Sequence, residues 1–317
     1  MDETSKKIDL LVASDWQYDN DFVQLMAKEA EKAHLTVLVV NHDKLDDTIK
    51  LVEKNSLDVL VLFDRASDTT EDFFRLQRLL AKRAHVIEPL DKMRWASDKA
   101  TMHLEFIANG LQTPYTIIID SFDNNNDIWL STDELAHLGR PFIIKPANTT
   151  GGGLGVVDGA ESLHDVLVAR RQFKSDKYLL QEKVIPLHIE NRRFWFRGFY
   201  TFGLVQCAWW NDVTQIYKIL DPAEVEQYSL QSLYSITEKI SAICGLNFFS
   251  TEICLSRSNS FVVVDYVNEA CDMRLQSKHV DGVPDEIVAN IAEHLCAQVA
   301  AIKKQHETGV RVLPEKA

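Results

Sequence analysis

The chain of 317 residues has no long apolar run, no closely spaced pair of cysteines and no surplus of positive charge. Without an apolar run of membrane-spanning length, we expect no transmembrane helix. The first residues, MDETSKKIDLLVASD, are acidic and lack the segments of a signal peptide, so we expect a cytoplasmic protein. The five cysteines are scattered and form no Cys-x-x-Cys pair, which argues against a disulfide framework and a zinc site.

The formal net charge is −13, which argues against a surface that holds a nucleic-acid backbone. We therefore expect neither a nucleic acid nor a membrane as a partner. Hydrophobic residues make up 46% of the chain and charged residues 26%, which is typical of a globular protein. The length suggests two or three domains rather than one compact core.

The first part of the chain alternates between apolar strand-like segments and helix-like segments. The segments IDLLVAS, LTVLVVN and LDVLVLFD are apolar on both faces, which is typical of a buried parallel sheet. The predicted helices between and after them are Asp21–Ala33, Lys44–Asn55 and Glu71–Ala84. The pattern predicts an N-terminal doubly wound parallel-sheet domain over residues 1–90.

The rest of the chain predicts an α/β (α+β) arrangement in two further parts, residues 91–184 and 185–317. Its strands include FIIKP, YLLQEKV, RRFWFRGFY, FGLVQCAWWN, FFSTEICL and FVVVDYVN. Its predicted helices are Ser97–Asn109, Ser162–Phe173, Glu224–Cys244 and Asp285–His306.

The strongest local signal is a lysine at the end of an apolar strand, followed at once by a glycine-rich loop. Lys145 ends the run FIIK, and the loop continues through Gly151, Gly152, Gly153 and Gly155. Glycine lets backbone N–H groups approach phosphate oxygens, and the lysine adds positive charge. The loop has no Lys-Ser/Thr pair after its glycines, so it is not a Walker A loop. The alternative is an exposed hairpin turn. We expect Thr149–Gly155 to be mobile without a ligand.

Acidic and amide side chains gather on two neighbouring strands near the end of the chain. Glu252 lies in STEICL, while Asp265, Asn268 and Glu269 lie in VVVDYVNEA. Oxygen ligands of this kind suit Mg²⁺ that is also held by phosphates. The alternative is a set of solvated strand ends. A buried Asp265 without a cation or hydrogen-bond donor would be costly, which favours the metal site.

In their order along the chain, these motifs resemble the ATP-grasp enzymes, a family that includes D-alanine–D-alanine ligase and glutathione synthetase. The resemblance runs from about Asp98 to Arg274. It implies a two-subdomain ATP-grasp fold after the N-terminal domain, with the glycine loop as a lid on the first subdomain and the magnesium site in the second. The positions that resemble the family's nucleotide contacts are Lys99, Lys145, Thr150, Gly151, Gly152, Gly153, Gln181, Glu182, Lys183, Val184, Glu190 and Asn191.

Two departures from the family's pattern leave alternatives open. The metal strand of the family has the spacing Glu-x-Asn, but here Asp265 and Asn268 are one residue further apart, so either Asn268 or Glu269 faces the metal. The family's ribose-binding acid aligns with Asn191, with Glu190 one residue away.

The resemblance implies a carboxylate–amine ligase that uses ATP and Mg²⁺ and forms an acyl phosphate. Its expected partners are small-molecule or peptide carboxylates and amines, and a homodimer is also considered. Lys218 and Arg274 are candidate catalytic residues for the substrate carboxylate or the anionic transition state. Two alternatives remain: a kinase of the same fold, and a nucleotide-binding regulatory protein without turnover.

Overall fold

The N-terminal part of the molecule is built on a parallel four-stranded sheet. The computed structural model describes residues 5–68, 70–122, 128–149 and 153–309. The strands lie in the order β2-β1-β3-β4 and all run parallel. Their bounds are β1 (Lys6–Ser14), β2 (Val37–Val40), β3 (Leu57–Arg65) and β4 (His85–Ile87). The predicted parallel sheet is confirmed.

Helices cover both faces of this sheet because its strands are apolar on both sides. One face packs against α1 (Asn20–Lys32) and α10 (Asp285–Thr308), and the other against α2 (His42–Glu53) and α3 (Phe74–Leu80). Helix α10 comes from the end of the chain, yet its buried residues share one core with β1 and with β11 and β12 of a second sheet. The C-terminal helix therefore packs in the same core as the N-terminal strand.

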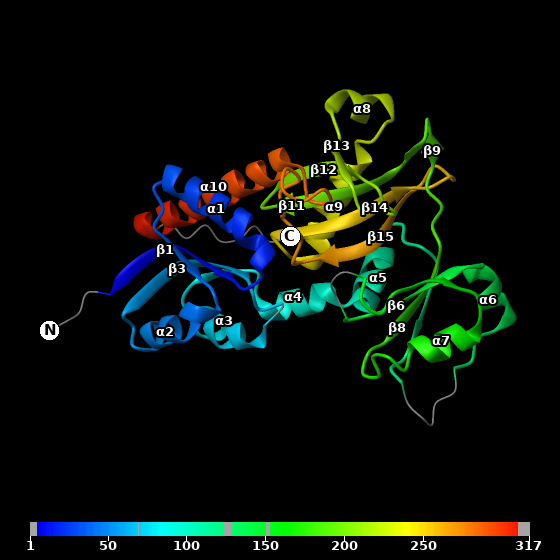
Figure 1. Ribbon diagram of the computed structural model, residues 1–317, viewed down its shortest axis with the longest axis horizontal. Coiled ribbons are helices and arrows are strands. Elements are labelled where there is room, and N and C mark those ends of the chain that lie inside the picture. The colour runs from blue at the N-terminus through cyan, green and yellow to red at the C-terminus, as the bar shows by residue number, and fades with distance from the viewer. Residues whose placement is uncertain (1–4, 69, 123–127, 150–152, 310–317) are drawn as a thin grey trace.

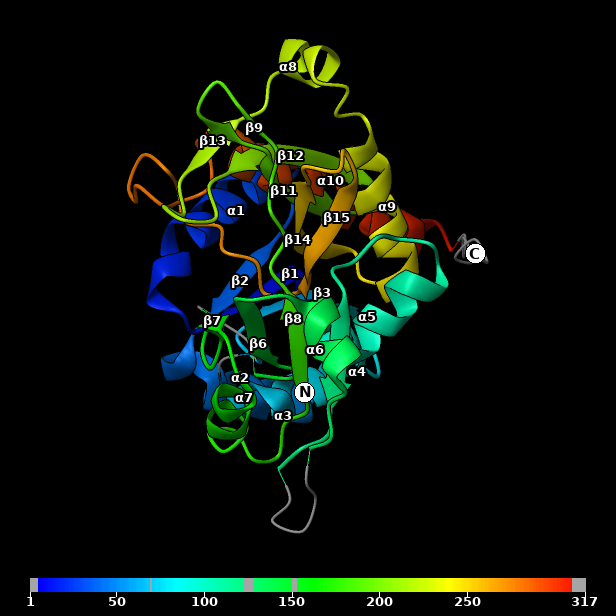
Figure 2. The ribbon, with the colours of Figure 1, turned by 90° about the vertical axis from the view of Figure 1, so that its right-hand side faces the viewer.

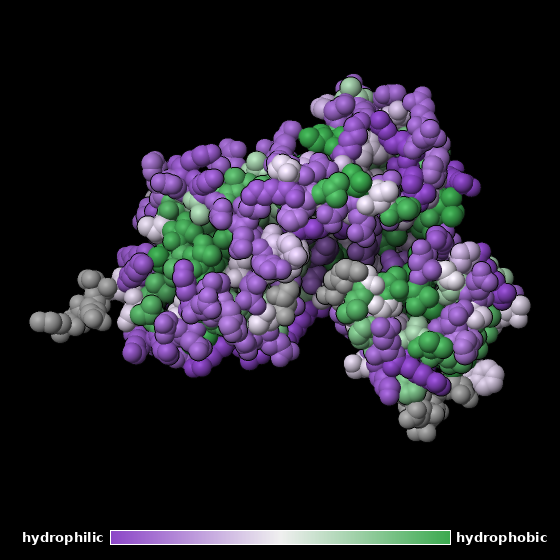
Figure 3. Space-filling view, viewed as in Figure 1, coloured by the Kyte–Doolittle hydropathy of each residue, from purple (hydrophilic) through white to green (hydrophobic). Residues whose placement is uncertain are grey.

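A second lobe follows, centred on an antiparallel four-stranded sheet in the order β5-β8-β6-β7. Its strands are β5 (Thr116–Ile119), β6 (Phe142–Pro146), β7 (Val157–Ala160) and β8 (Tyr178–Glu182). The chain reaches it through α4 (Leu90–Ser97) and α5 (Lys99–Ala108), and α6 (Thr132–Leu138) and α7 (Leu163–Ala169) complete it. Figure 3 shows this lobe standing apart from the N-terminal part, with a hollow between them.

The third sheet is antiparallel, with the order β13-β12-β11-β14-β15. Its strands are β11 (Trp195–Thr201), β12 (Leu204–Trp210), β13 (Tyr217–Ile219), β14 (Phe248–Leu255) and β15 (Phe261–Asn268). A short hairpin of β9 (His188–Ile189) and β10 (Arg192–Arg193) precedes it. Figure 2 shows this sheet above the sheet that contains β6 and β8.

The predicted single helix Glu224–Cys244 is wrong. The structure has α8 (Pro222–Gln227) and α9 (Ser232–Cys244), because Ser229 takes a left-handed φ of 54° and Leu230 is fully buried in the core between them. The other predicted helices are found, although α3 and α7 are shorter than expected and the chain also forms α4 and α6. No helix in the described residues is long and apolar enough to cross a membrane.

Candidate active site

Lys145 lies at the end of β6 and reaches across to the five-stranded sheet. It is only 8% exposed, and its Nζ donates to the main-chain oxygen of Val264, at 3.3 Å. Strand β15 is irregular here, since its pairing with β14 steps from Ile253↔Val263 to Glu252↔Asp265. Val264 therefore has no residue opposite it, and its carbonyl group is open to the lysine.

Glu252 and Asp265 are paired directly across β14 and β15, so two carboxylates lie side by side on this sheet. A partly buried arginine accompanies them: Nη2 of Arg197 on β11 lies 2.8 Å from Oε1 of Glu252. The indole Nε1 of Trp195 donates to the other oxygen, Oε2, at 3.1 Å. Both oxygens of Glu252 are thus engaged by side chains, whereas the Asp265 carboxylate has no side-chain hydrogen-bond donor among the described residues and is near only the main-chain N–H of Tyr266.

The surrounding charges set the protonation of the two carboxylates in opposite directions. Burial raises the pKa of Glu252, and the neighbouring charge of Asp265 adds to this increase against the opposing effect of Arg197. Burial would also raise the pKa of Asp265, but Lys145, Lys99 and Arg197 together hold it below its ordinary value. The three cations therefore favour the ionised form of Asp265.

A second irregularity of β15 determines where Asn268 points. The pairing steps from Glu252↔Asp265 to Ser250↔Asn268, so β15 has one residue more than β14 over this stretch. Tyr266 and Val267 both pack into the same core beneath the sheet. Asp265 and Asn268 therefore lie on the opposite face together, and the bulge accommodates the extra residue that separates them in the sequence.

Lys99 stands at the start of α5 and is fixed to the end of β6. Its main-chain N–H donates to the oxygen of Ala147, and its Nζ lies 3.3 Å from the oxygen of Thr149. Asp98 caps the helix by accepting from the N–H of Thr101. Lys99 and Lys145 thus lie beside the first residues of the glycine loop, and the charge of each lowers the pKa of Asp265.

The ends of the glycine loop are anchored by specific contacts. The carboxylate of Asp176 accepts from the main chain and side chain of both Asn148 and Thr149, at 2.7 to 3.0 Å. At the other end, Gly155 has a left-handed φ of 74° and lies against Phe173. Contacts thus hold both ends of the loop, and the mobility of Thr149–Gly155 without a ligand stays a prediction. Thr150, Gly151 and Gly152 lie outside the described residues, and Gly153 adopts a φ of 72° in open space.

The segment expected to meet the adenine lies at the end of β8. Gln181 is fully buried, and its amide nitrogen contacts the hydroxyl groups of Thr116 and Tyr266. Glu182 pairs through its main chain and side chain with Tyr115. Lys183 forms an ion pair with Asp158 at 2.8 Å, and Val184 packs on the apolar cluster of Trp195, Cys254 and Val264.

Three of the predicted site residues lie away from the charged group of Lys145, Glu252 and Asp265. Glu190 and Asn191 are exposed and form the two-residue turn between β9 and β10, with left-handed φ angles of 48° and 63°. Lys218 pairs with Glu224 at 3.1 Å. It points away from the face that carries Arg197, because the adjacent Tyr217 packs on that face and side chains alternate along a strand.

Arg274 and Glu269 line a separate cavity of about 450 Å³ that also includes Asn268. Arg274 is paired with two carboxylates, those of Asp272 and Asp281. Burial raises the pKa of Glu269 to about 7. This cavity adjoins the group of Glu252, Asp265 and Asn268, since the charges of Lys99 and Asp265 both affect the pKa of Glu269.

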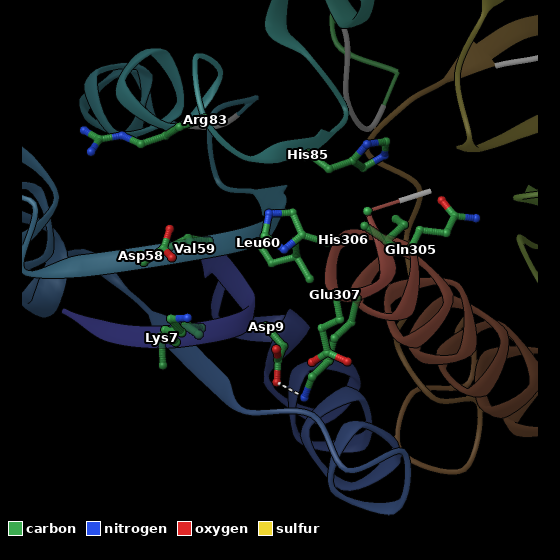
Figure 4. Close-up of a pocket in the computed structure, with 14 residues that line it drawn as sticks. Lys7, Asp9, Asp58, Val59, Leu60, Arg83, His85, Gln305, His306 and Glu307 are labelled. Atoms are coloured by element: carbon green, nitrogen blue, oxygen red, sulfur yellow. Dashed lines mark hydrogen bonds and ion pairs between the residues drawn. The ribbon is translucent and has the colours of Figure 1, made fainter. Parts of the chain in front are cut away.

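A larger hollow of about 610 Å³ lies at the opposite edge of the parallel sheet. Figure 4 shows residues at the starts of β1, β3 and β4 facing the end of α10, with Asp9 in an ion pair. Ligands of open α/β sheets bind at the carboxyl ends of the strands. Size alone therefore does not make this hollow the active site.

Arg197 is the main residue that the sequence reasoning missed. It lies within RRFWFRGFY, where three arginines occur among aromatic residues. A charged residue at an inward position of an apolar strand is the signal that could have identified it, as it did for Asp265.

Comparisons with known proteins support this geometry at the level of the fold. No family model matches the chain, and no curated protein matches it in sequence. Among solved structures, the RimK-domain ATP-grasp protein from Sphaerobacter thermophilus has a TM-score of 0.59 and 17% identity, over 92% of this chain and 100% of that one. D-cycloserine synthetase DcsG has a TM-score of 0.61 and 14% identity, over 92% and 99% of the two chains.

The ATP-grasp ligase PsnB, solved with a minimal precursor, Mg and ADP, has a TM-score of 0.61 and 11% identity, over 93% of this chain and 98% of that one. These neighbours span almost the whole chain, so the likeness covers the parallel sheet and both antiparallel sheets. The chain has the ATP-grasp fold.

Proposed function

We propose that this chain is an ATP-dependent ligase that joins a carboxylate to an amine and releases ADP and phosphate. The observation that carries the proposal is a group of three cations, the buried Lys145 with the partly buried Lys99 and Arg197, around the carboxylates of Glu252 and Asp265. Three positive and two negative charges leave a positive excess in a desolvated place. Phosphate oxygens would compensate that excess.

In this proposal the two lysines hold the phosphates, and the N–H groups of the glycine loop close over them. The adenine would lie against the main chain of Glu182–Val184, on the apolar surface formed by Trp195, Cys254 and Val264. Glu190 and Asn191 remain candidates for the ribose from the hairpin turn of β9 and β10.

The oxygen donors of the cluster fit Mg²⁺ only in the company of phosphates. No group of three or more His, Cys, Asp or Glu residues that could hold a metal occurs in the described parts of the chain. Mg²⁺ is commonly held by one or two carboxylates together with substrate phosphates, and Asp265, Glu252 and Asn268 match that pattern. When bound, the ion would neutralise charge on the phosphate oxygens.

The proposed reaction has two steps, a phosphoryl transfer and an acyl transfer. A carboxylate oxygen of the substrate bonds to the γ-phosphorus of ATP as the bond to ADP breaks. The amine nitrogen then bonds to the acyl carbon, phosphate leaves, and the amine gives up a proton. Lys145 and Arg197 would stabilise negative charge in the first step, and the enzyme acts by positioning and electrostatics. Arg274 stays a candidate for substrate binding, whereas Arg197 takes the role expected of Lys218.

The test is a trapping experiment with hydroxylamine. The purified protein is incubated with Mg-ATP and a panel of amino acids, small carboxylates and short peptides. A ligase should give ADP, phosphate and the hydroxamate of one carboxylate. Lys145→Met should abolish the product, whereas Lys54→Met, at an exposed lysine after α2, should not.

Other products would replace the proposal with one of its alternatives. A stable phosphate ester with no free phosphate would identify a kinase. Thermal stabilisation by Mg-ATP with no ADP formed from any member of the panel would identify a regulatory nucleotide-binding protein.

A further inference from the structure

The cavity of about 450 Å³ lies where an open α/β sheet is expected to bind a ligand. In the order β2-β1-β3-β4, the chain moves from β1 to β2 on one side and then crosses to β3 on the other side, so the topological switch point lies between β1 and β3. Trp16 follows β1, Arg65 ends β3 and Glu88 follows β4, so the carboxyl ends of three strands form one wall. The opposite wall is formed by Asn268, the last residue of β15, and by the segment that follows it. The cavity therefore adjoins the proposed metal site.

Acidic side chains outnumber basic ones in the lining of the cavity. Six carboxylates and two arginines line it: Asp19, Asp64, Asp68, Glu88, Glu269 and Asp272, with Arg65 and Arg274.

Both arginines are already paired with carboxylates. Nε and Nη2 of Arg65 each donate to Asp19 at 2.7 Å. All three guanidinium nitrogens of Arg274 contact Asp272 or Asp281. A carboxylate ligand would therefore have to displace an existing partner to reach either arginine.

Glu88 is the unusual residue of the group. It is 3% exposed, and its Oε1 accepts from the main-chain N–H of Asn247 at 2.7 Å. The other oxygen, Oε2, is buried and has no hydrogen-bond partner among the described residues, although the main-chain N–H of Phe248 is close enough to the carboxyl group to lower its pKa. Lys92, the neighbouring cation, directs its Nζ to the oxygen of Gly245 instead. A buried carboxylate oxygen without a donor is costly, so a ligand that supplies a donor would bind favourably.

The remaining lining is apolar, with Trp16, Phe63, Met93 and Phe248 around the carboxylates. This combination suits an ammonium group carried on an apolar stem. We propose that this cavity binds the amine substrate as an ammonium ion, with Glu88 accepting a hydrogen bond from it, and that it rejects carboxylates. The identification of this ligand as the amine substrate rests on the ligase function proposed above.

Binding of three matched probes to the native protein at pH 8, above the pKa of about 7 of Glu88, tests the proposal without nucleotide. The probes are phenethylamine, its neutral analogue 2-phenylethanol and the anion 3-phenylpropionate. Isothermal titration calorimetry and thermal stabilisation report binding. Phenethylamine should bind at least about 10-fold more tightly than the alcohol, which corresponds to about 1.4 kcal/mol. The anion should bind more weakly than the alcohol.

Glu88→Gln keeps an acceptor for the N–H of Asn247 and removes the charge. It should weaken phenethylamine binding about 10-fold and leave 2-phenylethanol unchanged, whereas Glu31→Gln, at an exposed acid on α1, should change neither.

Equal affinity for the amine and the alcohol, tighter binding of the anion, no binding of any probe, or an unchanged amine affinity in folded Glu88→Gln would each overturn the proposal. If that variant does not fold, the three probes still decide the question in the native protein. Amine binding without hydroxamate formation would reject the ligase and keep the cation site. Hydroxamate formation without selective amine binding would keep the ligase and reject the cation site.

Discussion

The Nζ atom of Lys145 lies 3.3 Å from the main-chain oxygen of Val264, on the one residue between Val263 and Asp265 that has no partner on β14. The bulge therefore links the lysine of one sheet to the carboxylates of the other. A carbonyl oxygen is a weak partner for a buried ammonium group compared with an anion. Lys145 is thus poised to prefer a phosphate when one is present.

Removal of the lysine charge should weaken nucleotide binding. We expect Lys145→Met to reduce ATP affinity by about 2–4 kcal/mol, the cost of losing one partner of a buried charge pair. Methionine retains most of the unbranched apolar stem, so the fold should survive. Calorimetric titration with ATP measures the effect, with Lys54→Met as the control. An unchanged affinity would exclude Lys145 from the site.

Magnesium should bind only together with the nucleotide. The described residues offer two carboxylates and one amide at the cluster, and Glu252 already has both oxygens engaged. Mg²⁺ alone at millimolar concentration should therefore leave the melting temperature unchanged, whereas Mg-ATP should raise it above the value with ATP alone. Asp265→Asn should remove this extra stabilisation and all turnover. Stabilisation by Mg²⁺ without nucleotide would contradict the shared site.

The bulge at Tyr266 and Val267 predicts that Asn268 rather than Glu269 faces the metal. We expect Asn268→Ala to lower magnesium-dependent turnover at least about 100-fold, on the scale of losing a metal-site group. Glu269→Gln should retain a magnesium dependence like that of the native protein. Activity measured against magnesium concentration separates the two, and the reverse ranking would mean that the bulge does not orient the strand in this way.

Of the two loop glycines that the structure describes, Gly155 should matter more for folding than Gly153. A Cβ there would lie 2.4 Å from a ring carbon of Phe173, in addition to the left-handed φ of 74°. Gly153 has a similar φ of 72° but meets nothing within 4 Å. We expect Gly155→Ala to destabilise the protein by about 1–3 kcal/mol more than Gly153→Ala, because overpacking adds to the backbone strain. Urea unfolding measures both variants, and equal stabilities would show that Phe173 moves aside.

The sequence predicts the parts of the site that lie within one strand or loop. Lys145 and Asp265 could be identified because each follows an apolar run, where a charged residue needs a reason to be buried. The bulges of β15 could not be predicted from periodicity, although the longer spacing from Asp265 to Asn268 signalled an irregularity.

Features that depend on distant segments were not predictable. The Glu88 environment combines β4 with Asn247, 159 residues later in the chain, and local pattern carries no information about that contact. The break between α8 and α9 has the same origin, since the tertiary burial of Leu230 overrides the helical periodicity.

Glu88 should also make stability depend on pH. Burial raises its pKa from 4.5 to about 7, against the opposing effects of the main-chain N–H groups of Asn247 and Phe248 and the charge of Lys92. Because the folded pKa lies above the unfolded value, folding favours the protonated acid. This contribution is fully present below pH 4.5 and is lost as the pH rises through 7.

Glu88→Gln removes that titration, so its stability relative to the native protein should increase between pH 5 and pH 8. The increase should be on the order of 3 kcal/mol, from about 1.4 kcal/mol for each pKa unit. Glu269 also has a raised pKa, but it is present in both proteins and largely cancels from the difference. Urea unfolding at four pH values measures this difference. Parallel stability curves would mean that Glu88 is ionised in the folded protein at pH 5, which requires a donor for its free oxygen.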